Sequence, residues 1–108
     1  MLTVGNLWKQ YHVEVGKIMT SELLGLGLID KADVQNENPD WPAYKKYFMH
    51  GTSHFLGLDT HDVGIWHEPI QAGMVFTCEP GIYIPEEGLG IRLEDDLVVQ
   101  SSGAPFNL

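Results

Sequence analysis

Hydrophobic side chains recur at helical spacing in the first quarter of the chain. Between residues 6 and 26 the apolar positions follow one another in steps of three or four, apart from one adjacent pair: Trp8, Tyr11, Val15, Ile18, Met19, Leu23 and Leu26. This periodicity is typical of an amphipathic helix with one buried face. Asn6 is a candidate N-cap, and Gly25 and Gly27 are candidate stop signals. We therefore predict a helix over residues 6–26 whose apolar stripe packs against a core.

The remainder of the chain divides into a connector, a histidine-rich segment and a series of strands. Residues 28–47 are polar and irregular, which indicates a connector with one helical turn near Tyr44. Residues 48–67 are dense in histidine and glycine. Between residues 74 and 99, β-branched and aromatic residues form short runs that predict antiparallel strands at 74–78, 82–84, 91–93 and 97–99. The expected fold class is α+β, with residues 1–108 in one domain.

Two glutamates are predicted to face each other across a hairpin. Residues 85–88, Pro-Glu-Glu-Gly, have the composition of a four-residue turn that glycine closes. If this turn joins two antiparallel strands, Glu79 faces Glu94, unless Pro80-Gly81 introduces a bulge. Facing Cβ atoms lie about 4.5–5.5 Å apart, and like charges at this distance destabilise the sheet. The pair therefore requires a shared proton, a divalent cation or exposure to water at a sheet edge.

Three of the five histidines lie within twelve residues, at His50, His54 and His61. If this segment is helical, His50 and His54 share a face, because they are four residues apart. Asp62 follows His61 directly and is a candidate partner to orient its ring. Neutral imidazole is a common metal ligand and a common proton shuttle. The cluster therefore indicates a metal site or an acid–base site.

The charge balance is acidic, with six Lys and Arg against fifteen Asp and Glu and a net charge of −9. Such a chain repels phosphate backbones, so we expect no nucleic-acid partner. Arg92, the only arginine, lies two residues before Glu94 and either holds that glutamate in position or forms an ordinary surface ion pair. The single cysteine, Cys78, allows no internal disulfide, and no apolar run reaches the roughly 20 residues that span a bilayer. We expect a cytoplasmic protein without membrane contact.

Three motifs in fixed order resemble the signatures of the Xaa-Pro aminopeptidases (aminopeptidase P), which belong to the pita-bread metallopeptidases with prolidase and methionine aminopeptidase. The motifs are H-G-T-S-H-F-L-G-L-D-T-H-D-V-G at residues 50–64, G-M-V-F-T-C-E-P-G-I-Y-I at 73–84 and G-I-R-L-E-D-D at 90–96. The resemblance is strong over residues 44–100 and less specific over the preceding helix. It implies the C-terminal half of a pita-bread fold, with a helix followed by a curved antiparallel sheet.

The resemblance also implies roles for individual residues. His54, Glu79 and Glu94 correspond to metal ligands, with Glu79 assisting the attacking water and Glu94 bridging two metals. His61 and His50 correspond to histidines that contact substrate, and His61 also assists proton transfer. Arg92 corresponds to an arginine that supports the ligand set, and Asp62 stays a candidate partner of His61. The implied cofactor is a pair of divalent ions, usually Mn²⁺. The implied substrate is a peptide with proline as its second residue.

The match is incomplete, because the family site has two further aspartate ligands on an upstream hairpin. Asp30, Asp33 and Asp40 lie in the polar connector and lack the expected spacing. We therefore expect a fragment of a peptidase, itself inactive, whether through construction, gene annotation or natural truncation. The alternative is a non-catalytic peptide-binding or scaffold module with the same fold. Because the missing half would cover one side of the sheet, we also predict a homodimer.

Overall fold

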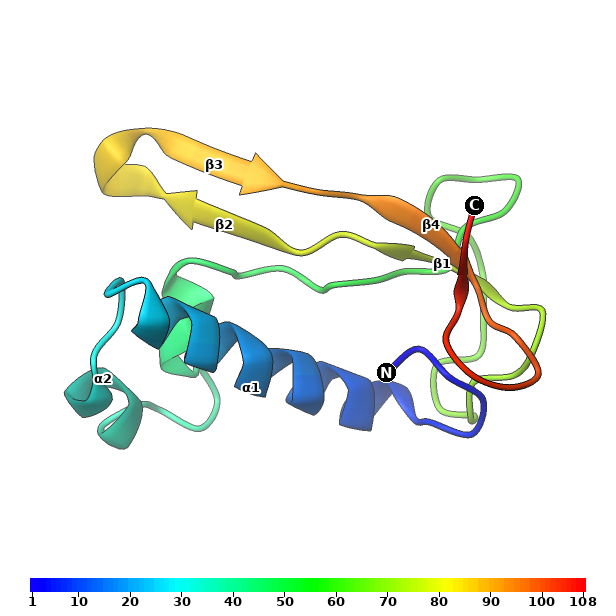
Figure 1. Cartoon of the computed structure of the whole chain (residues 1–108), viewed down its shortest axis with the longest axis horizontal. Coiled ribbons are helices and arrows are strands. Elements are labelled where there is room, and N and C mark those ends of the chain that lie inside the picture. The colour runs from blue at the N-terminus through cyan, green and yellow to red at the C-terminus, as the bar shows by residue number, and fades with distance from the viewer.

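A long helix lies beneath an extended antiparallel hairpin in the computed structural model, which describes residues 1–108 (Figure 1). Helix α1 spans Trp8–Gly25 and runs along the hairpin. The helices that follow are α2 (Lys31–Gln35) and the 3₁₀ turn η1 (Ala43–Lys46). The strands are β1 (Val75–Cys78), β2 (Gly81–Ile84), β3 (Leu89–Arg92), β4 (Asp95–Val98) and β5 (Phe106–Asn107).

Helix α1 occupies the predicted range to within two residues, and most of its apolar stripe is buried. The buried positions are Trp8, Tyr11, Val15, Gly16, Met19 and Leu23. Ile18 and Leu26, which belong to the predicted stripe, are exposed because they lie at its margins. The N-cap is Leu7 instead of Asn6. The Asn6 amide donates to the carbonyl of Met1 and the hydroxyl of Thr3, so it holds the N-terminal turn, while the N–H of Leu7 donates to Oε1 of Gln10 at the start of the helix.

The connector contains more helix than the sequence predicted. The helical turn near Tyr44 is confirmed as η1. Helix α2 was not predicted, although Asp30 and Asp33 form a reciprocal cap at its start, each side chain accepting the backbone N–H of the other. This pattern of capping residues three apart was the available signal. The ring of Tyr44 lies against Gly16 of α1, where an added Cβ would approach it to 2.9 Å.

The hairpin has the register that the turn composition predicted. The turn is a 3₁₀ segment over Pro85–Glu87, and Gly88 closes it with a φ of +61°, a conformation that favours glycine. β2 pairs with β3 and β1 pairs with β4, both antiparallel, as in Gly81 opposite Arg92 and Cys78 opposite Asp95. Both ladders follow one register, so the bulge considered at Pro80 does not shift the pairing. Short breaks in the ladder fall at residues 79–80 and 93–94.

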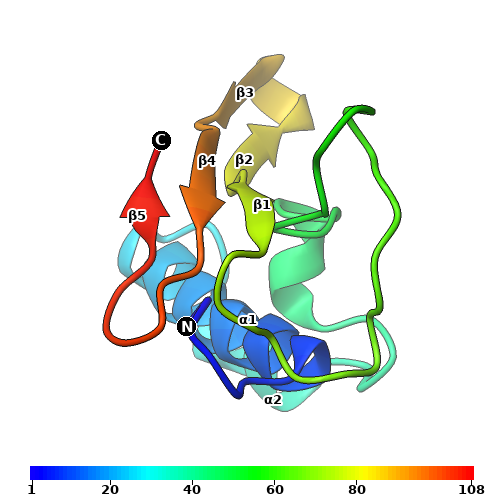
Figure 2. The ribbon, with the colours of Figure 1, turned by 90° about the vertical axis from the view of Figure 1, so that its right-hand side faces the viewer.

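The histidine-rich segment is extended or irregular where a helix was considered. Residues 52–55 lie along the edge of β1 that β4 leaves free, with Phe55 bridged to Phe76. The N–H of Thr77 donates to the carbonyl of His54, and the N–H of Glu79 donates to the carbonyl of Thr52. Residues 52–55 therefore act as a further extended segment alongside β1. On the other side, β5 extends the order to β1-β4-β5, with α1 below these strands in Figure 2.

An aromatic cluster joins α1 to the sheet and to the histidine-rich segment. Trp8 packs edge-on against Phe76 at a ring-centroid distance of 4.7 Å, and Phe55 contacts the same ring at 4.7 Å. Phe76 is fully buried at 0% exposure. It is therefore the residue at which helix, strand and histidine segment meet. A smaller second core of Leu23, Ile29 and Tyr47 lies at the other end of α1.

We expect Phe76→Ala to lower the free energy of unfolding by about 3–5 kcal/mol, because it removes a buried ring and leaves a cavity. Phe106→Ala is the matched control, since Phe106 is 55% exposed on β5 and its truncation should cost less than about 1 kcal/mol. Urea denaturation followed by tryptophan fluorescence measures both. Equal losses for the two variants would contradict the central position of Phe76.

Candidate metal centre

Three possible metal ligands converge on one face of the sheet. The register on either side of Glu79 and Glu94 places these glutamates opposite each other at the break in the ladder. His54 faces Thr77, two residues before Glu79, and facing or alternate residues share a face of a sheet. Ligand atoms of His54, Glu79 and Glu94 all lie within 4.8 Å of one another. The sequence predicted the glutamate pair, and the pairing of residues 52–55 with β1 adds the imidazole.

The imidazole of His54 is oriented by its own backbone. Nδ1 lies 2.9 Å from the carbonyl oxygen of Phe55, which can only accept, so Nδ1 carries a proton. In the neutral ring Nε2 then presents its lone pair, and it lies 3.3 Å from Oε2 of Glu79. Two acceptors at this distance are stabilised by a proton or a cation between them. A nitrogen and two carboxylates suit a borderline divalent metal, so the donor set fits such an ion.

Arg92 lies beside this cluster on β3. Its guanidinium Nη2 is 3.3 Å from Oε2 of Glu94, and both side chains are at least one-third exposed. The contact offsets part of the repulsion between the two glutamates. Because water screens the pair, its direct contribution to stability is small.

His61 reaches the cluster from a loop. Its ring lies over that of His54 at a centroid distance of 4.2 Å. Asp62 accepts the backbone N–H groups of Asp59 and Val63, and these hydrogen bonds hold the pKa of its carboxyl below the usual range. Asp62 therefore stabilises the conformation of the loop that contains His61. Any influence on the orientation of His61 acts through this loop backbone.

His50 lies near the start of the histidine-rich segment, and both of its ring nitrogens form hydrogen bonds. Nδ1 is 2.7 Å from the carbonyl oxygen of Gly51, and Nε2 is 2.7 Å from the hydroxyl of Tyr83 on β2. The carbonyl fixes the proton on Nδ1, so in the neutral ring Nε2 accepts from Tyr83. Sequence reasoning did not single out Tyr83. The available signal was its position four residues after Glu79, on the predicted strand.

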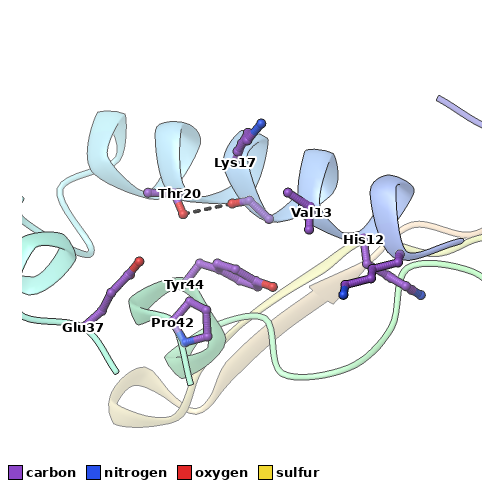
Figure 3. Close-up of a pocket in the computed structure, with 9 residues that line it drawn as sticks. His12, Val13, Lys17, Thr20, Glu37, Pro42 and Tyr44 are labelled. Atoms are coloured by element: carbon purple, nitrogen blue, oxygen red, sulfur yellow. Dashed lines mark hydrogen bonds between the residues drawn. The ribbon is translucent and has the colours of Figure 1, made fainter. Parts of the chain in front are cut away.

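A hollow lies between α1 and residues 37–44, away from the candidate ligands (Figure 3). Its volume is about 550 Å³, and Tyr44 and Pro42 face His12 and Thr20 across it. Burial and the nearby Lys45 lower the pKa of His12. None of the three candidate metal ligands lines this hollow. His12 is therefore separate from the metal cluster. None of the helices combines the length and the apolar character that a membrane-spanning helix needs.

Comparison with known proteins gives one consistent result. The profile of metallopeptidase family M24 matches residues 1–101. The Xaa-Pro aminopeptidase of Haemophilus influenzae is 41% identical over 95% of this chain and 26% of its own length. The Escherichia coli enzyme is 46% identical over 83% of this chain and 23% of its own length.

Solved structures agree with the sequence relatives. Escherichia coli aminopeptidase P with the inhibitor Pro-Leu superposes with a TM-score of 0.77 at 39% identity, over 97% of this chain and 26% of that one. A zinc-substituted form of the same enzyme, in complex with product, gives the same values. The chain thus spans about a quarter of the length of these relatives.

Replacement of Glu94 by glutamine should change stability in opposite directions with and without metal. In EDTA we expect Glu94→Gln to stabilise the chain by a few tenths to about 1 kcal/mol, because it removes the repulsion from Glu79. With added Mn²⁺ the variant should lose most of the metal-induced rise in melting temperature. Glu87→Gln, in the exposed turn, is the control and should show neither effect. A rise in melting temperature with Mn²⁺ equal to that of the wild type would contradict a ligand role for Glu94.

Proposed function

The chain belongs to metallopeptidase family M24, and from this premise we propose that residues 1–108 form the C-terminal part of the catalytic domain of an Xaa-Pro aminopeptidase. The fold is α+β and is that of the pita-bread aminopeptidases. This chain corresponds to about a quarter of the length of such an enzyme. The observation that carries the proposal is the convergence of His54, Glu79 and Glu94 on one face of the sheet.

The proposed cofactor is a pair of divalent ions, with Mn²⁺ as the expected metal, of which this chain supplies part of the ligand set. His54 would bind through Nε2, whose lone pair faces Glu79. Glu79 and Glu94 would bind through their carboxylates, with Glu94 as the bridging ligand. When bound, such ions lower the pKa of a water molecule and polarise the scissile carbonyl. Arg92 would hold Glu94 in place through its contact of 3.3 Å.

The proposed substrate is a peptide with proline as its second residue. His61 would assist proton transfer and contact the substrate, because its ring lies beside His54. His50, held by Tyr83 and Gly51, would line the pocket with a fixed tautomer. Glu79 would position or deprotonate the attacking water, and Asp62 would shape the His61 loop. The net charge of −9 favours a peptide with a free, positively charged amine.

We further propose that residues 1–108 alone are inactive. The chain offers three ligands, and the connector aspartates do not complete the set, since the carboxylates of Asp30 and Asp33 cap α2. A non-catalytic binding or scaffold module is the second candidate, but retention of all three ligands expected in this span favours the peptidase. A cytoplasmic location is part of the proposal and rests on the single, unpaired Cys78.

A graft tests the function directly. This chain replaces the corresponding segment of the Escherichia coli Xaa-Pro aminopeptidase, to which it is 46% identical over the aligned residues. We expect the chimera to cleave a peptide with proline second and not its counterpart with alanine second. In the chimera, His54→Ala and Glu79→Gln should each lower kcat/KM at least 100-fold, whereas Glu87→Gln should change it less than twofold. A folded, metal-loaded chimera without hydrolysis would favour the scaffold alternative.

The proposal includes a homodimer of the isolated chain. An apolar groove of about 610 Å³ lies between α1 and the β2–β3 hairpin, and β3 pairs with β2 alone. Ile91 and Leu93 beside this groove are 61% and 72% exposed. An exposed apolar face next to an unpaired strand edge favours association.

We therefore expect light scattering to report twice the chain mass at high concentration, and Ile91→Asp to shift it to the monomer. Val63→Asp is the matched control, because Val63 is 90% exposed on a loop outside the groove, and it should leave the mass unchanged. A monomeric mass for the wild-type chain at all concentrations would contradict this part of the proposal.

A further inference from the structure

The segment that carries His54 is held to β1 by an unusual hydrogen bond. In an antiparallel pair of this kind, two facing residues exchange both backbone N–H···O bonds. Here the N–H of Thr77 donates to the carbonyl of His54 at 3.0 Å, as expected. The N–H of His54 donates to the side-chain hydroxyl Oγ1 of Thr77, also at 3.0 Å. The Thr77 side chain therefore replaces a backbone acceptor at the residue opposite the candidate ligand.

This hydroxyl belongs to a residue adjacent to two of the candidate ligands. Thr77 is 2% exposed, and it shares its sheet face with His54 opposite and with Glu79 two residues along. A buried backbone N–H that loses its acceptor is costly, so the hydroxyl strongly constrains where the His54 backbone can lie.

The orientation of the His54 imidazole depends on the position of the His54 backbone. Nδ1 of His54 bonds to the carbonyl of the next residue, Phe55, so the ring is fixed relative to its own main chain. Nε2 is consequently directed toward Glu79 only while residues 54 and 55 keep their position against β1. A displacement of this segment would move Nε2 away from the two carboxylates.

A buried pair of hydroxyl groups also holds this segment, at the residue before His54. Ser53 Oγ and the Tyr11 hydroxyl of α1 lie 2.7 Å apart, and both residues are buried. Burial raises the pKa of Tyr11 to about 12, so the phenol keeps its proton at neutral pH and can donate. This bond acts on the neighbour of His54 and not on His54 itself. It offers a comparison with equal burial but without direct contact to the ligand.

We propose that Thr77 is a positioning residue for the metal centre: its hydroxyl fixes the His54 backbone and thereby directs Nε2 toward Glu79 and Glu94. The inference rests on the proposed metal-binding function of these three residues. It assigns a specific task to a buried side chain that is not itself a ligand. Outer groups that orient metal ligands typically change metal affinity by roughly 10- to 100-fold when they are removed.

The test separates the hydroxyl of Thr77 from its shape. Thr77→Val keeps the shape and loses the hydroxyl, whereas Thr77→Ser keeps the hydroxyl and loses a methyl group. Calorimetric titration of the chain with Mn²⁺ should show at least a 10-fold loss of affinity for Thr77→Val and less than a threefold loss for Thr77→Ser. The visible spectrum of the Co²⁺-loaded chain should shift for the valine variant and match the wild type for the serine variant.

Tyr11→Phe distinguishes positioning from general stability. It removes a buried hydrogen bond near the site, so it should lower the melting temperature of the metal-free chain while changing Mn²⁺ affinity less than threefold. Equal affinity losses for the valine and serine variants, or a loss for Tyr11→Phe as large as that for Thr77→Val, would overturn the inference. If the wild-type chain binds neither Mn²⁺ nor Co²⁺, the proposed metal site fails and the inference fails with it.

Discussion

Glu79 and Glu94 face each other across the hairpin, and the repulsion between two carboxylates in such positions is the constraint around which the site is arranged. Their alignment depends on the turn at residues 85–88, where Gly88 adopts the left-handed conformation that closes the hairpin. A slip of one residue would send one glutamate to the opposite face of the sheet. The burial of Phe76 prevents such a slip, because its ring fills the core beneath the same strand.

The third ligand comes from a part of the chain that is distant in sequence from the second glutamate. Residues 52–55 lie along the free edge of β1, and their bonds to Thr77 and Glu79 place His54 diagonally across from the carboxylates. The carbonyl of Phe55 then fixes the tautomer of the imidazole. Helix α1 supports this arrangement from below, through the aromatic contacts of Trp8. The site is thus built from three adjacent extended segments that rest on one helix.

The open face of the molecule follows from the same architecture. β1 is covered by the His54 segment on one edge and by β4 on the other, whereas β3 has a partner on one edge only. Four exposed apolar residues, Leu26, Leu89, Ile91 and Leu93, line the groove there, beside the C-terminal end of α1. Relatives about four times longer have additional chain that this sequence does not include.

The sequence by itself determined the features that depend on near neighbours. The spacing of apolar residues gave α1, and the turn composition fixed the hairpin centre and with it the pairing of Glu79 and Glu94. The three ordered motifs indicated the family. Local capping at Asp30 could also have given α2. The tertiary structure alone decided the pairing of residues 52–55 with β1, the proton on Nδ1 of His54 and the bond between His50 and Tyr83. The first and the last of these contacts join segments that share no period, so only packing of the whole chain brings them together. The proton on Nδ1 depends on the side-chain conformation that places this atom against the carbonyl of Phe55.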